Sequence, residues 1–121
     1  TDSKWLEFIL NQIINNSIKY KRDNISSYIK IKTYENTNSV ELFVEDNGIG
    51  IPKNDLGQVF DKCFTGENGR EKFKSTGMGL YIAKKLCVKL GHKIEVESEE
   101  ENFTRVIITF GKNDFYKLDI K

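Results

Sequence analysis

The chain has 121 residues, a length that suits one domain with a single two-layer core. It carries 19 Lys and Arg against 18 Asp and Glu, interspersed along the chain, so no footprint of a nucleic-acid or membrane-surface binder is present. No apolar run approaches the length that spans a bilayer, no signal peptide is visible, and two cysteines without CxxC spacing indicate a reduced, intracellular setting. Because the chain begins with Thr1, we expect a piece of a longer protein whose other part could hold a membrane segment.

The first predicted element is a helix from Ser3 to about Arg22. Its apolar positions recur at the helical period and form one broad arc, which contains Trp5, Leu6, Ile9, Leu10, Ile13 and Tyr20. Asn16 lies inside this arc near its edge, whereas Asn15 points towards water. Gln12 and Lys19 continue that edge as a polar seam. Asn16 can therefore reach a site between the helix and a sheet, although an edge asparagine also commonly bonds to nearby backbone.

Two strands joined by a turn are predicted next, over residues 28–35 and 40–46, as an antiparallel hairpin. The first strand is predicted to be half-exposed because its apolar and polar positions alternate: Ile29, Ile31 and Thr33 against Lys30, Lys32 and Tyr34. In the second strand, Asp46 falls in phase with the apolar side chains of Val40, Leu42 and Val44. A carboxylate on the apolar side is costly unless other groups donate hydrogen bonds to it.

Two glycines follow this carboxylate in the sequence Asp46-Asn47-Gly48-Ile49-Gly50. Glycines at this spacing let the backbone turn sharply or let another molecule approach closely. A buried acid beside such a backbone suggests a ligand that donates a hydrogen bond to Asp46. A plain Asp-Asn-Gly turn between strands is the alternative.

A short helix is predicted over residues 54–61, capped by Asn54 or Asp55, with Leu56, Val59 and Phe60 facing inward. Residues 62–76 then lose all periodicity, and a loop this long in a compact domain is either functional or disordered. Cys63 at its start is interpreted as an inert structural thiol, with a reactive thiol as the alternative.

A second helix is predicted from Met78 to Leu90, with Cys87 in its core arc and Gly91 as its C-cap. Two further strands follow, over residues 92–98 and in a last strand whose inward face carries Val106, Ile108 and Phe110. Residues 112–121 are expected to be a frayed tail. The predicted fold class is α+β, a two-layer sandwich over residues 1–111 with helices on one face of a largely antiparallel mixed sheet.

Two well-known phosphate-binding signatures are absent from the sequence. There is no GxxxxGK[ST], and neither Gly-x-Gly pair has the third glycine of the dinucleotide fingerprint. Gly77-Met78-Gly79 precedes the second helix, where free N–H groups and the helix dipole favour anions. With Asn16 and Lys19 opposite, this arrangement suits a phosphate–Mg²⁺ unit.

Four motifs resemble the N, G1, F and G2 boxes of sensor histidine kinases, in the family's order and spacing. They are Asn16-Ser17-Ile18-Lys19-Tyr20, residues 46–50, the pair Phe60 and Phe64, and Thr76-Gly77-Met78-Gly79-Leu80. The resemblance covers nearly the whole chain. It implies the Bergerat (GHKL) ATP-binding fold and the catalytic domain of a two-component kinase, similar in residues 5–10 and 63–70 to small intramembrane-sensing kinases.

Roles for individual residues follow from this resemblance by matching position. Asp46 would accept from the exocyclic amine of adenine, Asn16 would ligate Mg²⁺ and Lys19 would contact phosphate. Tyr20 would pack on the adenosine. The other implied nucleotide-binding positions are Gly48, Gly50, Ile51, Phe60, Phe64, Thr76, Gly77, Met78, Gly79 and Leu80.

The sequence departs from the family pattern at two places. Gln12 stands where many members have Asn and where Bergerat-fold hydrolases carry a Glu that activates water. A neutral amide cannot be that general base, which disfavours fast ATP hydrolysis. The Arg that many relatives carry after the aromatic pair is replaced by Thr65-Gly66, so Arg70 is our candidate catalytic cation, with Lys74 second. A solvated loop residue is the alternative for Arg70.

The implied activity is transfer of the γ-phosphoryl group of ATP to a histidine on a separate dimerisation domain, which makes the parent a phosphoprotein, with a response regulator downstream. His92, the one histidine of this chain, lies between a capping glycine and a strand, an unsuitable context for that acceptor. We expect a soluble, monomeric, cytoplasmic domain of a parent in the cell membrane. The alternatives are another GHKL-fold ATPase, an anti-sigma serine kinase, or a nucleotide-regulated docking module.

Overall fold

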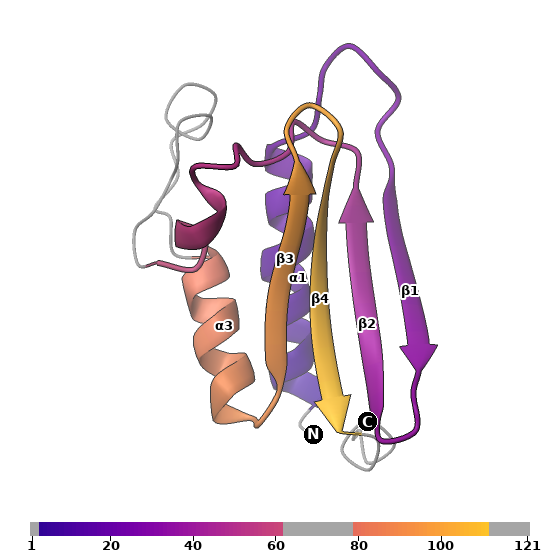
Figure 1. Cartoon of the computed structure of the whole chain (residues 1–121), viewed down its shortest axis with the longest axis vertical. Coiled ribbons are helices and arrows are strands. Elements are labelled where there is room, and N and C mark those ends of the chain that lie inside the picture. Colours follow the sequence, from indigo (N-terminus) through magenta and orange to yellow (C-terminus); the bar gives the residue numbers. More distant parts are fainter. Residues whose placement is uncertain (1–2, 62–78, 112–121) are drawn as a thin grey trace.

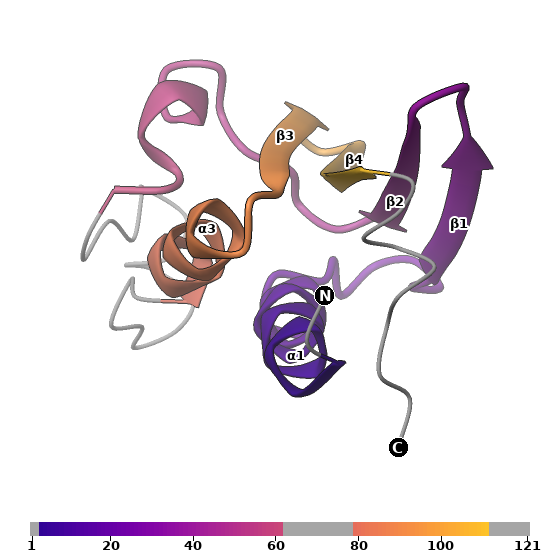
Figure 2. The same cartoon turned by 90° about the horizontal axis from the view of Figure 1, so that it is seen from below.

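The fold is a four-stranded sheet with two helices on one face (Figure 1; Figure 2). The computed structural model describes residues 3–61 and 79–111. The elements in these ranges are α1 (Ser3–Lys19), β1 (Ile29–Glu35), β2 (Ser39–Asp46), η1 (Leu56–Gln58), α3 (Gly79–Lys89), β3 (Lys93–Glu99) and β4 (Phe103–Gly111). The predicted α+β two-layer architecture is confirmed. The domain limit at residue 111 stays a prediction.

The sheet order is β1-β2-β4-β3, and each neighbouring pair is antiparallel. The predicted hairpin of β1 with β2 is present, and β3 and β4 form a second hairpin. The central β2–β4 pair joins the two hairpins, with Val44 opposite Val106 and Asp46 opposite Thr104. The parallel component implied by a mixed sheet is not seen among the described strands.

The core lies between the sheet and the two helices. The second predicted strand alternates as expected, with every even-numbered residue of β2 buried. The inward face predicted for the last strand is confirmed as well. The core cluster contains Ile9, Ile13, Leu42, Val44, Ala83, Cys87, Ile94, Val106, Ile108 and Phe110. Burial of these branched and aromatic side chains stabilises the layer contact, at roughly 1.5–3 kcal/mol for each fully buried large side chain.

Helix α1 differs from the prediction in its width and its end. The buried stripe consists of Ile9, Ile13 and Ser17, spaced four apart, and Trp5 is 47% exposed. The prediction that Trp5 belongs to the core face is wrong: it continues the spacing of the stripe by one turn, but it lies in the first turns of the helix, where its side chain stays largely exposed. The helix ends at Lys19, three residues before the predicted end.

Strand β1 is exposed along its whole length, so the prediction of a half-exposed strand is wrong. Its apolar positions are on the helix side of the sheet, but α1 lies beneath the inner strands and leaves β1 uncovered (Figure 2). Alternation in a sequence indicates which residues share a face of the sheet. It does not indicate whether a helix layer covers that face.

The segment after Pro52 forms less helix than predicted. The predicted helix over residues 54–61 is reduced to a single 3₁₀ turn, Leu56–Gln58, and Asp55 at its N-cap makes no side-chain capping bond. Val59 is buried, as expected. The predicted loop at 62–76, with Cys63, and the tail at 112–121 lie outside the described residues.

The end of α3 matches its predicted glycine cap. Gly91 has φ of 81°. Its N–H donates to the carbonyl of Val88 at 3.1 Å, and the His92 N–H donates to the carbonyl of Cys87 at 2.8 Å. These two bonds form a Schellman motif, which satisfies carbonyls that would otherwise be left free at the helix end.

Cys87 is fully buried, and burial raises the pKa of its thiol to about 11. The test uses a Cys63→Ser variant, in which Cys87 is the remaining thiol. At about pH 8 we expect Cys87 of the folded protein to react with iodoacetamide roughly 100-fold or more slowly than Cys87 of the protein unfolded in urea. The reason is that few folded molecules carry a thiolate and that the reagent reaches it only when the core opens. Labelling followed by mass spectrometry measures both rates. Equal rates would contradict the core position of Cys87.

Candidate functional site

The candidate site is built around Asp46, at the end of β2. The residue is 8% exposed and points towards the helix layer, in phase with the apolar residues of its strand. Its two carboxylate oxygens accept separate hydrogen bonds: Oδ2 from the Ser17 hydroxyl at 2.7 Å and Oδ1 from the Gly48 N–H at 2.9 Å. The sequence-based expectation of a buried acid supplied with donors is met.

Burial raises the pKa of Asp46 above its ordinary value, and the nearby charge of Glu45 adds to this effect. The hydrogen bonds from Ser17 and Gly48 act in the opposite direction by stabilising the ionised form. A carboxylate offers about four acceptor positions, and the bonds from Ser17 and Gly48 use only part of them. Asp46 can therefore accept a further hydrogen bond from a ligand.

The end of α1 is attached at two points to the end of β2 and to the loop that follows β2 (residues 47–51). One is the Ser17–Asp46 bond, and the other is a bond from the Ile49 N–H to the Tyr20 carbonyl at 2.9 Å. These attachments place the end of α1, with Asn16, Lys19 and Tyr20, beside the loop. Asn16 is half-buried whereas its neighbour Asn15 is exposed, so the predicted difference between the two asparagines is confirmed.

The two glycines of the loop are required by close backbone packing. A Cβ on Gly48 would lie 2.5 Å from the Tyr20 carbonyl oxygen. Gly50 has φ of 72°, and a Cβ there would overlap the Glu99 carbonyl and lie 2.9 Å from Glu100 Cα. The space that each glycine leaves open is thus filled by the chain's own backbone. That Gly48 and Gly50 also let the adenine base approach the backbone stays a prediction.

Arg22 also holds the loop in place. Its guanidinium donates to the carbonyl oxygens of Asn47 at 2.9 Å and Glu101 at 2.8 Å. The loop also pairs directly with the turn between β3 and β4, since the Glu101 N–H donates to the Ile49 carbonyl at 2.6 Å. This network joins the end of β2 to the β3–β4 turn and ties the backbone that follows Asp46 to that turn.

Ile51, a predicted nucleotide-binding residue, is held at the far end of the same loop. Its N–H donates to the Ser98 hydroxyl oxygen at 2.8 Å, and that hydroxyl donates to the Phe103 carbonyl at 2.7 Å. The half-buried Ile51 side chain therefore extends from a backbone fixed to the β3–β4 hairpin.

The start of α3 lies next to the middle of α1. A Cβ on Gly79 would be 3.2 Å from the Gln12 side-chain oxygen. Asn16 follows Gln12 by one helical turn and so shares its edge. The first N–H groups of α3 have no partner within the helix, and such groups favour an anion. Leu80, the next residue, packs partly buried against the core.

The structure thus attaches Asp46 to the end of α1 and places the start of α3 beside the middle of the same helix. Phe60 is half-buried against the core, with Lys84 Nζ 5.0 Å from its ring centroid. The remaining predicted site residues, Phe64, Arg70, Thr76, Gly77 and Met78, lie outside the described residues. Their roles stay predictions.

Sequence reasoning missed three residues that support the site: Ser17, Arg22 and Ser98. Ser17 continues the Ile9–Ile13 spacing of four, and that periodicity could have placed it on the buried stripe. The hydrogen bonds of Arg22 and Ser98 connect residues distant in sequence, and no local pattern indicates them.

Mg²⁺ has one predicted protein ligand here, the half-buried Asn16. Within residues 3–61 and 79–111 there is no group of three or more His, Cys, Asp or Glu side chains that could hold a metal. A single protein ligand such as Asn16 suits Mg²⁺, which is usually held by one or two protein groups together with phosphate oxygens and water. Also within these ranges, no helix has the length and apolar character needed to cross a membrane.

Comparisons with known proteins agree with this geometry. The family described as "Histidine kinase-, DNA gyrase B-, and HSP90-like ATPase" matches residues 1–114. Over 110 residues the chain is 41% identical to the sensor protein BceS and 37% identical to the sensor histidine kinase YxdK, both of Bacillus subtilis. These matches cover 91% of this chain in each case, and 32% and 34% of the relatives.

Solved structures show the same fold. The mycobacterial sensor histidine kinase MprB aligns with a TM-score of 0.76 at 22% identity, over 92% of this chain and 72% of that one. The catalytic domain of histidine kinase ThkA aligns with a TM-score of 0.72 at 26% identity, over 90% and 68%.

The chain belongs to the family of histidine kinase-, DNA gyrase B- and HSP90-like ATPases. Within this family it is a catalytic ATP-binding domain of the two-component sensor kinase type. The chain spans about a third of the length of the curated relatives that it matches.

Proposed function

We propose that the chain binds Mg·ATP and transfers the γ-phosphoryl group to a histidine on a dimerisation domain of its parent sensor kinase. That domain would then pass the phosphoryl group to a response regulator. The parent would lie in the cell membrane with this domain in the cytoplasm. The observation that supports the proposal most is the buried Asp46, which keeps acceptor capacity beside the end of α1.

Each element of the site has one task in this proposal. Asp46 accepts from the exocyclic amine of adenine, and its bonds to Ser17 and Gly48 hold the carboxylate in place beforehand. Tyr20 packs on the adenosine, while Lys19 and the first N–H groups of α3 contact phosphate oxygens. Asn16 is the protein ligand of Mg²⁺. When bound, Mg²⁺ neutralises phosphate charge, and the protein contributes positioning and charge stabilisation.

The phosphoryl acceptor has to be supplied by another segment or chain. His92, the one histidine of the sequence, is 5% exposed, and its ring centroid lies 4.5 Å from that of Phe110. Phosphoryl transfer requires the acceptor nitrogen to reach the γ-phosphate in line. A buried imidazole at the sheet end cannot do this without unfolding of the core.

Gln12 favours transfer to an acceptor over hydrolysis. Its side-chain oxygen lies against the start of α3, where the phosphates would be held. A neutral amide can orient a water molecule but cannot take its proton. We therefore expect the bound ATP to persist until a histidine is presented.

The test supplies the parent's dimerisation domain in trans with γ-labelled Mg·ATP. We expect the label on the acceptor histidine, no label on a variant domain with that histidine replaced, and steady-state hydrolysis near background. No labelling of the histidine would overturn the proposal. Fast hydrolysis would point to an ATP-driven clamp, and a labelled serine on an anti-sigma antagonist would point to a serine kinase.

A further inference from the structure

Among the residues that the structure describes, strand β1 is an edge of the sheet that no other strand or helix covers. The strand order leaves β1 and β3 at the two edges, and η1 packs beside β3 (Figure 1). Every residue of β1 is exposed, and in the part of the chain that the structure describes no element lies along its outer side (Figure 2). An exposed edge carries unpaired backbone N–H and C=O groups that can pair with another strand.

Two bonds at the ends of the hairpin reveal which groups of β1 face outward. The Tyr28 N–H donates to Asn47 Oδ1 at 2.9 Å, and the Asn36 N–H donates to the Ser39 carbonyl at 2.8 Å, so both N–H groups point towards β2. In a strand, successive residues direct their N–H and C=O groups to opposite sides. The groups of Ile29, Ile31 and Thr33 therefore point outward, available to an added strand.

The two faces of β1 present different side chains. Ile29 and Ile31 lie on the helix side and are 38% and 54% exposed. Lys30 and Lys32 lie on the opposite face, and within residues 3–61 and 79–111 neither ammonium group has a carboxylate within ion-pair distance. An added strand would thus meet aliphatic side chains on one face and two cations on the other.

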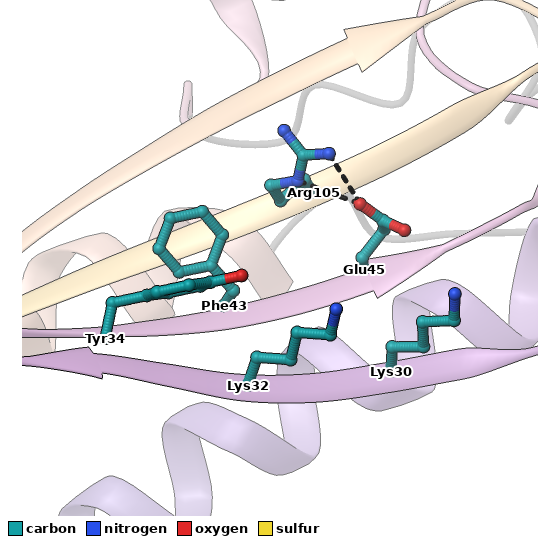
Figure 3. A pocket seen from close by; sticks show the side chains of 6 residues that line it. All are labelled: Lys30, Lys32, Tyr34, Phe43, Glu45 and Arg105. Carbon is teal, nitrogen blue, oxygen red and sulfur yellow. Dashed lines mark hydrogen bonds and ion pairs between the residues drawn. The ribbon is translucent and has the colours of Figure 1, made fainter.

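A shallow hollow of about 270 Å³ adjoins these lysines on the outer face of the sheet (Figure 3). Its lining consists of Lys30, Lys32, Tyr34, Phe43, Glu45 and Arg105. The Glu45 carboxylate is held by Arg105 at 2.6 and 2.9 Å and by the Tyr28 hydroxyl at 3.1 Å. Lys30, its cross-strand partner, stays outside ion-pair distance, and its Nζ lies 4.7 Å from the Tyr28 ring centroid. The hollow can receive the acidic side chains of a neighbouring strand.

We propose that β1 binds, by strand addition, an extended protein segment whose side chains alternate between acidic and aliphatic residues. The acids would lie beside Lys30 and Lys32, and the aliphatic groups beside Ile29 and Ile31. Backbone bonds of this kind supply affinity, while the alternating side chains supply specificity. The proposal does not depend on nucleotide binding.

The same lysines exclude the competing occupant, a second copy of this strand. Two β1 edges pairing antiparallel would bring the lysine rows of both copies onto one face, and like charges across a strand pair are destabilising. A segment with acids in those positions converts that repulsion into attraction. The charge of the edge therefore selects the partner.

The experiment uses the whole chain and two octapeptides, one alternating valine with glutamate and one alternating valine with lysine. NMR hydrogen exchange follows the backbone amides. We expect the glutamate peptide to slow exchange of the Ile29, Ile31 and Thr33 amides by roughly 10-fold, with a weaker effect at high salt. The lysine peptide should give no protection. Protection by neither peptide, or equal protection by both, would overturn the proposal.

Two variants separate backbone pairing from charge. Ile31→Pro removes the central outward N–H, and proline is tolerated at an edge where the lost N–H faces solvent, so peptide protection should disappear. Lys30→Glu with Lys32→Glu should reverse the preference in favour of the lysine peptide. A charge-reversed, folded variant that still prefers the glutamate peptide would contradict the proposal, whether or not the proline variant folds.

Discussion

Replacing Asp46 by Asn is expected to abolish nucleotide binding while leaving the domain folded. The substitution removes a charged acceptor and turns an amide donor towards the donor group of adenine, which should weaken binding by roughly 100-fold or more. Calorimetric titration with Mg·ATP measures the loss. Unchanged affinity in the folded variant would exclude adenine recognition by Asp46.

Glu45→Gln is the matched control for this substitution. Glu45 precedes Asp46 but lies on the opposite face of the sheet, where it pairs with Arg105. Removing its charge should leave nucleotide affinity unchanged within about 3-fold, with a stability cost of about 1 kcal/mol for the half-exposed pair. A partner that docks away from both the nucleotide pocket and the hollow lined by Lys30, Lys32 and Glu45 should bind both variants equally.

The stability of the Asp46→Asn variant should change with pH in a defined direction. Because burial raises the pKa of Asp46 in the folded state, the native protein holds this proton more tightly than the unfolded chain. The stabilisation of the wild type that comes from protonated Asp46 is fully present below the pKa of the unfolded chain. It is lost as the pH rises through the pKa of the folded protein. The variant should therefore gain stability relative to the wild type as the pH rises from about 4, the ordinary pKa of an aspartate, through the higher folded pKa. Urea unfolding across that range measures the difference, and a constant difference would contradict it.

Replacing Gly50 by Ala is expected to be among the most destabilising single changes in the described part of the chain. Its positive φ alone costs about 1–2 kcal/mol for a residue with a Cβ, and the clash with the backbone at Glu99 adds to this, for a total of about 3 kcal/mol or more. The change should also displace the loop that presents Asp46, so nucleotide affinity should fall together with stability. Chemical denaturation measures the first effect and titration the second.

Two other glycines serve as controls for Gly50. Gly57 has no atom within 4 Å of its Cβ position, so Gly57→Ala should change stability by less than about 0.5 kcal/mol. Gly91 has open space but φ of 81°, so Gly91→Ala should cost about 1 kcal/mol through backbone strain alone. If Gly50→Ala lowers the free energy of unfolding by no more than Gly91→Ala does, close backbone packing is not what requires a glycine at position 50.

Part of the fold and site follows directly from residue patterns. The strict alternation in β2 is sufficient to place Asp46 on the buried face, because a strand turns successive side chains to opposite sides. The glycine after α3 is similarly predictable, since the αL position of a Schellman motif favours a residue without a Cβ. Both are consequences of local geometry acting on adjacent residues.

Other features depend on which layers meet. Trp5 and Ile31 are apolar and in phase with buried residues, yet both are exposed because no described layer covers the margin of α1 or the edge strand. Ser17 is polar, yet it is buried because α1 places it against the Asp46 carboxylate. Periodicity indicates a direction around a helix or strand, and it contains no information about how far the opposing layer extends.

Residue patterns are sufficient to predict the α+β class, the acid at the end of β2, the two glycines after it and the helix edge with Asn16. The groups that support that acid, namely Ser17 from α1 and Arg22 between two turns, follow from tertiary packing, and so does the exposure of every residue of β1. The physical reason is the range of the interactions. Side-chain alternation and capping act within a few residues, whereas these hydrogen bonds and burial limits join segments that meet only when the helices pack on the sheet.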